Sequence, residues 1–222
     1  MGFPMPRSPA MQSEHASART LNPEAGEHPI GAHPGEQAAA EVSTRISWKE
    51  FPYYAKRYGE RGWRFSLSDS GWLQTLAELP PEAAKSQVLW LAGVLAARGM
   101  PRFLLERHLQ HLHAQLLVGV PVRAGGYGFL LSLSEYLREI RTSRIPEERF
   151  AALAASFEAA TKGCAGKVRN MGVVIVAAVA DDMAGVAGVL ESVRSWASDG
   201  SRFAPEWVDA VQATIEQARA GG

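Results

Sequence analysis

Residues 81–117, PEAAKSQVLWLAGVLAARGMPRFLLERHLQHLHAQLL, contain the clearest evidence for the fold. Gly99 follows the last apolar position of one helical pattern, and Pro101 lies at a first-turn position of the next. In the second pattern four leucines recur at helical spacing and form one apolar stripe: Leu105, Leu109, Leu112 and Leu116. The stretch therefore predicts two consecutive helices, over residues 82–97 and 101–117.

The same start and stop signals divide residues 46–222 into about nine helical segments of ordinary length. Capping boxes at Ser47/Glu50 and Ser66/Asp69 predict a short aromatic-rich helix ending near Gly59 and a second one reaching residue 79. Beyond residue 117, the expected helices are 127–142, 146–162, 168–182, 185–197 and 205–218.

An all-α compact bundle of eight or nine helices is the expected fold. Residues 173–176 are all β-branched and are compatible with a buried strand, but the alanines that follow favour a helix. A shift of 85 residues lays residues 88–106 on 173–191 with five identities, which suggests two pseudo-repeated four-helix halves. A short α-solenoid of helix pairs is the alternative.

Residues 1–45 have the composition of a disordered tail. They contain six of the 13 prolines, and Phe3 is their only aromatic residue, so they offer little apolar surface to bury. All six tryptophans lie after Ile46. We therefore expect residues 46–222 to form a single all-α domain.

Composition and charge exclude several classes of protein. Equal numbers of basic and acidic side chains, 23 of each, make bulk nucleic-acid binding an unlikely function. Cys164 is the only cysteine, which rules out an intramolecular disulfide and fits a reducing compartment. The first residues lack a signal-peptide pattern, and no apolar run approaches the ~20 residues that span a bilayer. The chain is expected to be cytoplasmic, without a membrane partner.

Clustered imidazoles in the 101–117 helix are the most conspicuous candidate chemistry. Helical geometry places His108 and His113 on opposite sides of the leucine stripe and directs His111 mostly to solvent. The three side chains are therefore not expected to converge, and no metal site is predicted. A single imidazole suffices as an axial ligand of a tetrapyrrole, and His108 or His113 is the candidate for that role, with His108 chosen as the ligand-binding candidate.

Aromatic side chains could also line a pocket for a planar ligand, since such rings bury large areas. Ordinary core packing explains a string from Trp48 to Trp72 equally well. The tryptophans chosen as ligand-binding candidates are Trp63, Trp72 and Trp90. Asp181 and Asp182, at the end of the most apolar helix, are the acidic candidates because burial there would perturb their carboxyl groups.

Three functional hypotheses follow. The leading one is a cytoplasmic regulatory or protein-interaction module, binding another protein or a second copy of itself, since no catalytic motif is present. The second is a helical sensor or carrier for a tetrapyrrole or another planar apolar ligand. The third is an enzyme built on a helical bundle, using Asp181 or Asp182 with a histidine. The identity of any cofactor is left open.

Overall fold

The computed structural model describes residues 15–220, and over this range the protein is a compact all-α fold with one small hairpin, as the sequence predicted. The hairpin pairs β1 (His15–Ser17) with β2 (Pro29–Gly31) in antiparallel register. Helices of the first half are α1 (Pro34–Glu50), α2 (Tyr53–Thr75), α3 (Pro81–Ala97) and α4 (Arg102–Gly119). Those of the second half are α5 (Gly128–Thr142), α6 (Glu147–Ala160), α7 (Met171–Met183), α8 (Val189–Ala197) and α9 (Pro205–Arg219).

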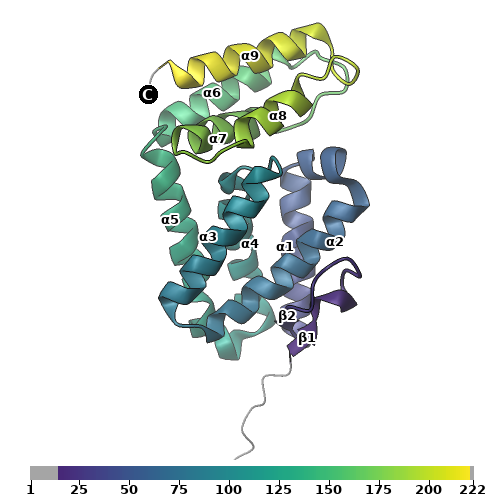
Figure 1. The fold of residues 1–222 in the computed structure, drawn as a ribbon, viewed down its shortest axis with the longest axis vertical. Coiled ribbons are helices and arrows are strands. Elements are labelled where there is room, and N and C mark those ends of the chain that lie inside the picture. Colours follow the sequence, from purple (N-terminus) through teal and green to yellow (C-terminus); the bar gives the residue numbers. More distant parts are fainter. Residues whose placement is uncertain (1–14, 221–222) are drawn as a thin grey trace, which may run out of the picture.

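The helices form two groups that share one long axis. Figure 1 shows α6, α7, α8 and α9 together at one end, α1 to α4 with the hairpin at the other, and α5 running between the groups. Each group has its own apolar core cluster, one built mainly from α3, α4 and α5 and the other centred on α7. Short 3₁₀ segments connect α2 to α3 (Leu76–Glu78) and α4 to α5 (Pro121–Tyr127).

α7 is the most deeply buried helix. Every residue from Val174 to Ala180 is at most 1% exposed, which confirms that the β-branched stretch forms a helix and lies at the centre of its group. Gly172 allows α6 to pack close to α7, because a Cβ atom on Gly172 would lie only 2.6 Å from the carbonyl oxygen of Ala154. The absence of one side chain thus sets the distance between the two helices.

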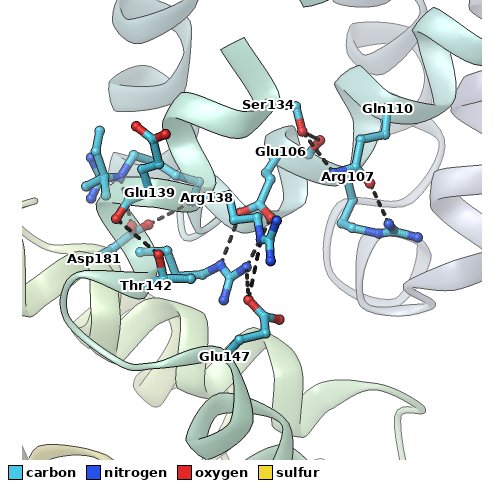
Figure 2. Close-up of polar contacts among 12 residues, drawn as sticks. Glu106, Arg107, Gln110, Ser134, Arg138, Glu139, Thr142, Glu147 and Asp181 are labelled. Carbon is cyan, nitrogen blue, oxygen red and sulfur yellow. Dashed lines mark hydrogen bonds and ion pairs between the residues drawn. The ribbon is translucent and has the colours of Figure 1, made fainter. Parts of the chain in front are cut away.

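A buried ion pair joins the two groups. The Arg141 guanidinium donates to both carboxylate oxygens of Glu106 at 3.1 Å and to Glu147 at 2.9 Å (Figure 2). The same guanidinium lies 5.0 Å from the ring centroid of Phe103 and 4.5 Å from that of Phe150. It therefore connects α4, α5 and α6 at one point.

The predicted tail over residues 1–45 is wrong for residues 15–45, while residues 1–14 lie outside the described range. Residues 15–45 form the hairpin and most of α1, and Ala18 and Ile30 are fully buried. Large apolar side chains are scarce in this segment, but it packs mainly through small residues. In particular, Gly35 and Gly119 bring α1 against α4 so closely that a Cβ on Gly35 would overlap the carbonyl group of Gly119.

Both predicted capping boxes are also wrong, because the helices extend through them. Ser47 lies in the last turn of α1, and Ser66 with Asp69 lies well inside α2. Gly59 does not end a helix; it kinks α2 with a φ of 56° and a ψ of −154°, a conformation that glycine adopts without steric penalty. Residues that the sequence treated as helix ends therefore face other helices.

The helices related by the 85-residue shift are not equivalent in their packing. α3 corresponds to α7, and neither sequence has a continuous polar face, which predicts that both helices are central elements. α7 is enclosed, whereas Trp90 on α3 is 61% exposed. The prediction of a central α3 is wrong at that face, although Val88 and Leu91 on the opposite face are buried.

Burial of α7 makes a strong prediction for stability. Val176→Asp should lower the free energy of unfolding by several kcal/mol, because Val176 is 0% exposed and a carboxylate there would have no partner. Val122→Asp is the matched control, since Val122 is 91% exposed, and its effect should stay within about 0.5 kcal/mol. Urea unfolding followed by tryptophan fluorescence measures both. Equal losses in the two variants would contradict the position of α7.

Candidate functional site

A cavity with two adjoining chambers lies among the first four helices. The larger chamber, which also touches the exposed Arg61 and Arg98 and which we call the outer chamber, has a volume of about 250 Å³. The smaller one, which reaches His108 and which we call the inner chamber, has a volume of about 40 Å³. Six residues line both chambers: Trp48, Tyr54, Ser66, Asp69, Leu95 and Met100. α1 and α2 supply the first four, and the other two come from α3 and the turn that follows it. The kink in α2 belongs to this arrangement, because Tyr54 precedes it and Asp69 follows it.

Aromatic rings form much of the outer chamber. Trp48 stacks on Tyr54 with ring centroids 5.5 Å apart and an interplanar angle of 11°, and Tyr58 and Phe65 complete the wall. The indole nitrogen of Trp48 donates to Ser66 Oγ at 3.1 Å, which satisfies its only polar atom. The wall therefore offers flat apolar surfaces whose positions are set by packing and by one hydrogen bond.

Asp69 is the one acid that lines the cavity. Within residues 15–220 its carboxyl group makes no hydrogen bond and no ion pair. Burial raises the pKa of Asp69 from its ordinary value to about 7, and the positive charge of Arg98 opposes this only in part. Near neutral pH this carboxyl group is thus partly protonated.

His108 reaches the inner chamber from α4. Its Nε2 atom is 2.8 Å from Ser70 Oγ, and its Nδ1 atom is 3.0 Å from Ser47 Oγ. Burial, with a smaller contribution from the nearby charge of His111, lowers the pKa of His108 to about 4. The imidazole is therefore neutral at physiological pH.

The hydrogen bonds of Ser47 and Ser70 determine which ring nitrogen of His108 carries the proton. Ser70 donates to the carbonyl oxygen of Ser66 at 2.7 Å, so its oxygen accepts the proton on His108 Nε2, and Nδ1 accepts from Ser47. Both ring nitrogens are occupied by protein partners. This arrangement argues against His108 as an axial ligand of a tetrapyrrole and favours a positioning role in the cavity wall.

The open side of the outer chamber carries two arginines. Arg61 is already paired, with its Nε atom 2.8 Å from Glu24 and its guanidinium 5.0 Å from the Phe65 ring centroid. Arg98 is exposed, and its guanidinium has no hydrogen bond or ion pair with any residue from 15 to 220. A positive charge without a partner among residues 15–220 thus lines the same chamber as the half-buried Asp69 carboxyl group.

The tryptophans chosen from the sequence do not line this cavity. Trp63 packs edge-on against Trp48, with centroids 5.2 Å apart, and only indirectly supports the aromatic wall. Trp72 contacts His28 of the N-terminal segment and Trp90 of α3, at centroid distances of 6.4 and 6.2 Å. Of the four ligand-binding candidates, His108 alone is brought to the cavity.

His111 does not point to solvent, which corrects the helical-wheel prediction. Its Nε2 atom lies 2.6 Å from Glu50 at the end of α1, and Arg107 binds the other oxygen of the same carboxylate. Burial would raise the pKa of Glu50, but these two partners lower it overall. The helical angles of α4 alone predict a solvent-exposed His111, because they do not include α1, which packs along that side of α4.

The two acidic candidates have structural partners outside the cavity. Asp181 is buried and accepts from the Arg102 backbone amide and from its side chain, both at 2.7 Å. Burial raises the pKa of Asp181, and Arg102 opposes the change. Asp182 pairs with Arg219 on α9 at 2.7 Å. Neither aspartate meets a histidine, so the pair expected for an enzyme is not assembled here.

Sequence reasoning missed Asp69 because it was interpreted as part of a helix cap. A signal was nevertheless present. If α2 is drawn as one helix, Gly62, Phe65, Ser66, Asp69 and Leu73 fall on a single face with spacings of three and four residues. An acid at the centre of an otherwise inward-facing stripe is an indication of a buried carboxyl group.

Comparisons with known proteins add no assignment: no family model matches the chain, and neither a curated protein nor a solved structure is significantly similar to it. In the range 15–220, no helix is long and apolar enough to cross a bilayer. The same range contains no group of three or more His, Cys, Asp or Glu side chains arranged to hold a metal ion.

Asp69 and His108 should affect stability in opposite directions as pH changes. The folded-state pKa of Asp69 is raised from 3.8 to about 7, so the folded protein binds the extra proton and loses stability as pH rises through that window. The folded-state pKa of His108 is lowered from 6.5 to about 4, so its contribution is lost as pH falls below 6.5. In wild-type protein the two effects partly cancel between these limits.

Single variants should separate the two effects. Asp69→Asn is expected to raise the free energy of unfolding at pH 8 by on the order of 2 kcal/mol and to change it little at pH 4. His108→Gln should remove the loss of stability on acidification below pH 6.5. Urea titrations at successive pH values test both, with the exposed Asp209→Asn as control. The same effect of Asp69→Asn at pH 4 and pH 8 would show that ionisation of this carboxyl group does not destabilise the fold.

Proposed function

We propose that this protein binds a small organic molecule in the α1–α4 cavity and acts as a helical sensor or carrier. The observation that carries the proposal is the Asp69 carboxyl group, which faces an aromatic-lined chamber without a partner among residues 15–220. A buried carboxyl that serves the fold is normally paired or hydrogen-bonded. An unsatisfied one in a cavity is typical of a binding site.

Other buried acids of this chain provide the contrast. Glu36 pairs with Arg123 at 2.7 Å, Glu106 with Arg141 at 3.1 Å, and Asp181 with Arg102 at 2.7 Å. The chain therefore satisfies its structural carboxylates with arginine. Asp69 is half-buried in the cavity wall and departs from that pattern, which is consistent with a role in binding a ligand.

Cavity volume limits the size of the ligand. An apolar cavity of about 150 Å³ is sufficient for benzene, and pockets for drug-sized molecules measure about 300–1,000 Å³. The outer chamber, at about 250 Å³, lies between these sizes. The proposal is therefore a molecule with one ring, or an equivalent apolar body, and polar substituents. A tetrapyrrole contains four such rings and does not match this volume.

Filling the cavity should abolish binding. Leu95→Trp adds bulk to a wall shared by both chambers, and Leu131→Trp makes the same change at an exposed position on α5. Native mass spectrometry of freshly purified full-length protein should detect a small bound molecule in wild type and in Leu131→Trp, but not in Leu95→Trp. The same spectra after addition of small aromatic compounds extend the test to ligands that are lost in purification.

Two results would contradict the proposal. One is identical ligand content in Leu95→Trp and wild type, which would place the molecule elsewhere. The other is the absence of any bound species, with no small aromatic compound raising the Tm of wild type more than that of Leu95→Trp. Circular dichroism of the variant confirms that it remains folded.

A second candidate function, protein interaction by self-association, is favoured by Trp90. This side chain is 61% exposed on α3 and meets the Trp72 ring edge-on, and exposed tryptophans are common anchors of protein interfaces. Trp90→Ser should convert a concentration-dependent dimer into a monomer in sedimentation experiments, whereas the control Val122→Ser should not. Wild-type protein that stays monomeric at high concentration would remove this candidate.

A further inference from the structure

Two opposite charges without partners line the outer chamber. The Asp69 carboxyl group lies in the wall that the chambers share, and the Arg98 guanidinium lies at the mouth. Within the described part of the chain neither group makes a hydrogen bond or an ion pair, so the two side chains do not neutralise each other directly. Arg98 is nevertheless near enough for its charge to influence Asp69.

The position of Arg98 is set by its backbone. Its carbonyl oxygen accepts a hydrogen bond from Tyr58 at 3.0 Å, and the next residue, Gly99, accepts one from Tyr53 at 2.6 Å. Gly99 has a φ of 86°, which ends α3 in a tight turn. The turn fixes the point at which the Arg98 side chain leaves the backbone beside the chamber, and the side chain has no partner among residues 15–220.

We propose that the ligand is a small zwitterion with an apolar body, whose protonated nitrogen pairs with Asp69 and whose acid group pairs with Arg98. This inference rests on the ligand-binding function proposed above. Such a molecule would satisfy both unpaired charges of the chamber at once. Its apolar body would lie against the rings of Trp48, Tyr54 and Phe65.

Ligands with a single charge fit the chamber less well. An amine alone would pair with Asp69 but leave Arg98 unmatched at the mouth, where Arg61 adds a second positive charge that Glu24 already balances. An acid alone would pair with Arg98 but bring a negative charge towards Asp69. A neutral ring would leave both charges without partners. Charge complementarity across a site selects the ligand that matches both groups.

The aromatic wall suits the nitrogen end of such a ligand. A cation near the face of a tryptophan or tyrosine ring is attracted by the negative centre of that ring, and the effect is larger in a partly desolvated site. Trp48 and Tyr54 line both chambers, as Asp69 does. The protonated nitrogen would therefore meet an acid and aromatic rings in the same part of the cavity.

A matched series of phenyl compounds tests the inference. L-Phenylalanine carries both charges, 2-phenylethylamine only the positive one, 3-phenylpropionate only the negative one, and toluene neither. Their Kd values are measured by calorimetry on full-length wild type, Asp69→Asn and Arg98→Gln. The controls are Asp209→Asn and Arg144→Gln, which make the same changes at exposed positions.

The two charge variants should weaken the binding of different sets of compounds. Asp69→Asn should weaken L-phenylalanine and 2-phenylethylamine by about tenfold or more, and Arg98→Gln should weaken L-phenylalanine and 3-phenylpropionate by about tenfold, since each removes one charge-assisted contact. Asp69→Asn should not raise the Kd of 3-phenylpropionate, and Arg98→Gln should not raise that of 2-phenylethylamine. Neither variant should raise the Kd of toluene. The control variants should bind all four compounds as wild type does.

Failure of this inference is distinguishable from failure of the ligand-binding function. If toluene binds, Leu95→Trp abolishes that binding, and the two charge variants weaken all compounds equally or none, the cavity binds ligands but the zwitterion proposal is wrong. Failure of L-phenylalanine to bind wild type at millimolar concentration also overturns it. If no compound of any charge distinguishes wild type from Leu95→Trp, the ligand-binding function itself is wrong.

Discussion

The ion pair between Glu106 and Arg141 is the contact on which the arrangement of the two helix groups depends. Both side chains are at most 5% exposed, and the guanidinium also binds Glu147 and lies between the rings of Phe103 and Phe150. Removing one member of such a pair leaves a buried charge uncompensated, which typically costs about 3–5 kcal/mol. The pair therefore constrains the relative placement of α4, α5 and α6, because each buried charge needs the other.

α4 carries this constraint into the candidate site. On one side of the helix, Glu106 binds Arg141 on α5, and Arg102 binds Asp181 on α7 of the second group. Another side bears Leu104, Leu105 and His108, which line the inner chamber. Because a helix is rigid over a few turns, the buried pairs that position α4 also position His108 against α1 and α2. The cavity is thus shaped partly by contacts that lie outside it.

The cavity wall contains polar side chains that have hydrogen-bond partners and one acid, Asp69, that has none among residues 15–220. His108 has both ring nitrogens bonded to serines, and the Trp48 indole is bonded to Ser66. Asp69 has no such partner among residues 15–220, and its pKa of about 7 reflects the unfavourable burial of its charge. Satisfied groups hold the walls in place, so a ligand gains the full benefit of the one remaining unsatisfied acid.

Local signals were enough to predict the helical class and most helix limits after residue 80. Proline at first turns and glycine after last turns act within a few residues, so the expected 82–97 and 205–218 agree closely with α3 and α9. The burial of residues 15–45, the inward position of Asp69 and the pairing of His111 with Glu50 were not predictable in this way. Each depends on a helix packing against another that is distant in the chain, and composition or periodicity of a single segment does not contain that information.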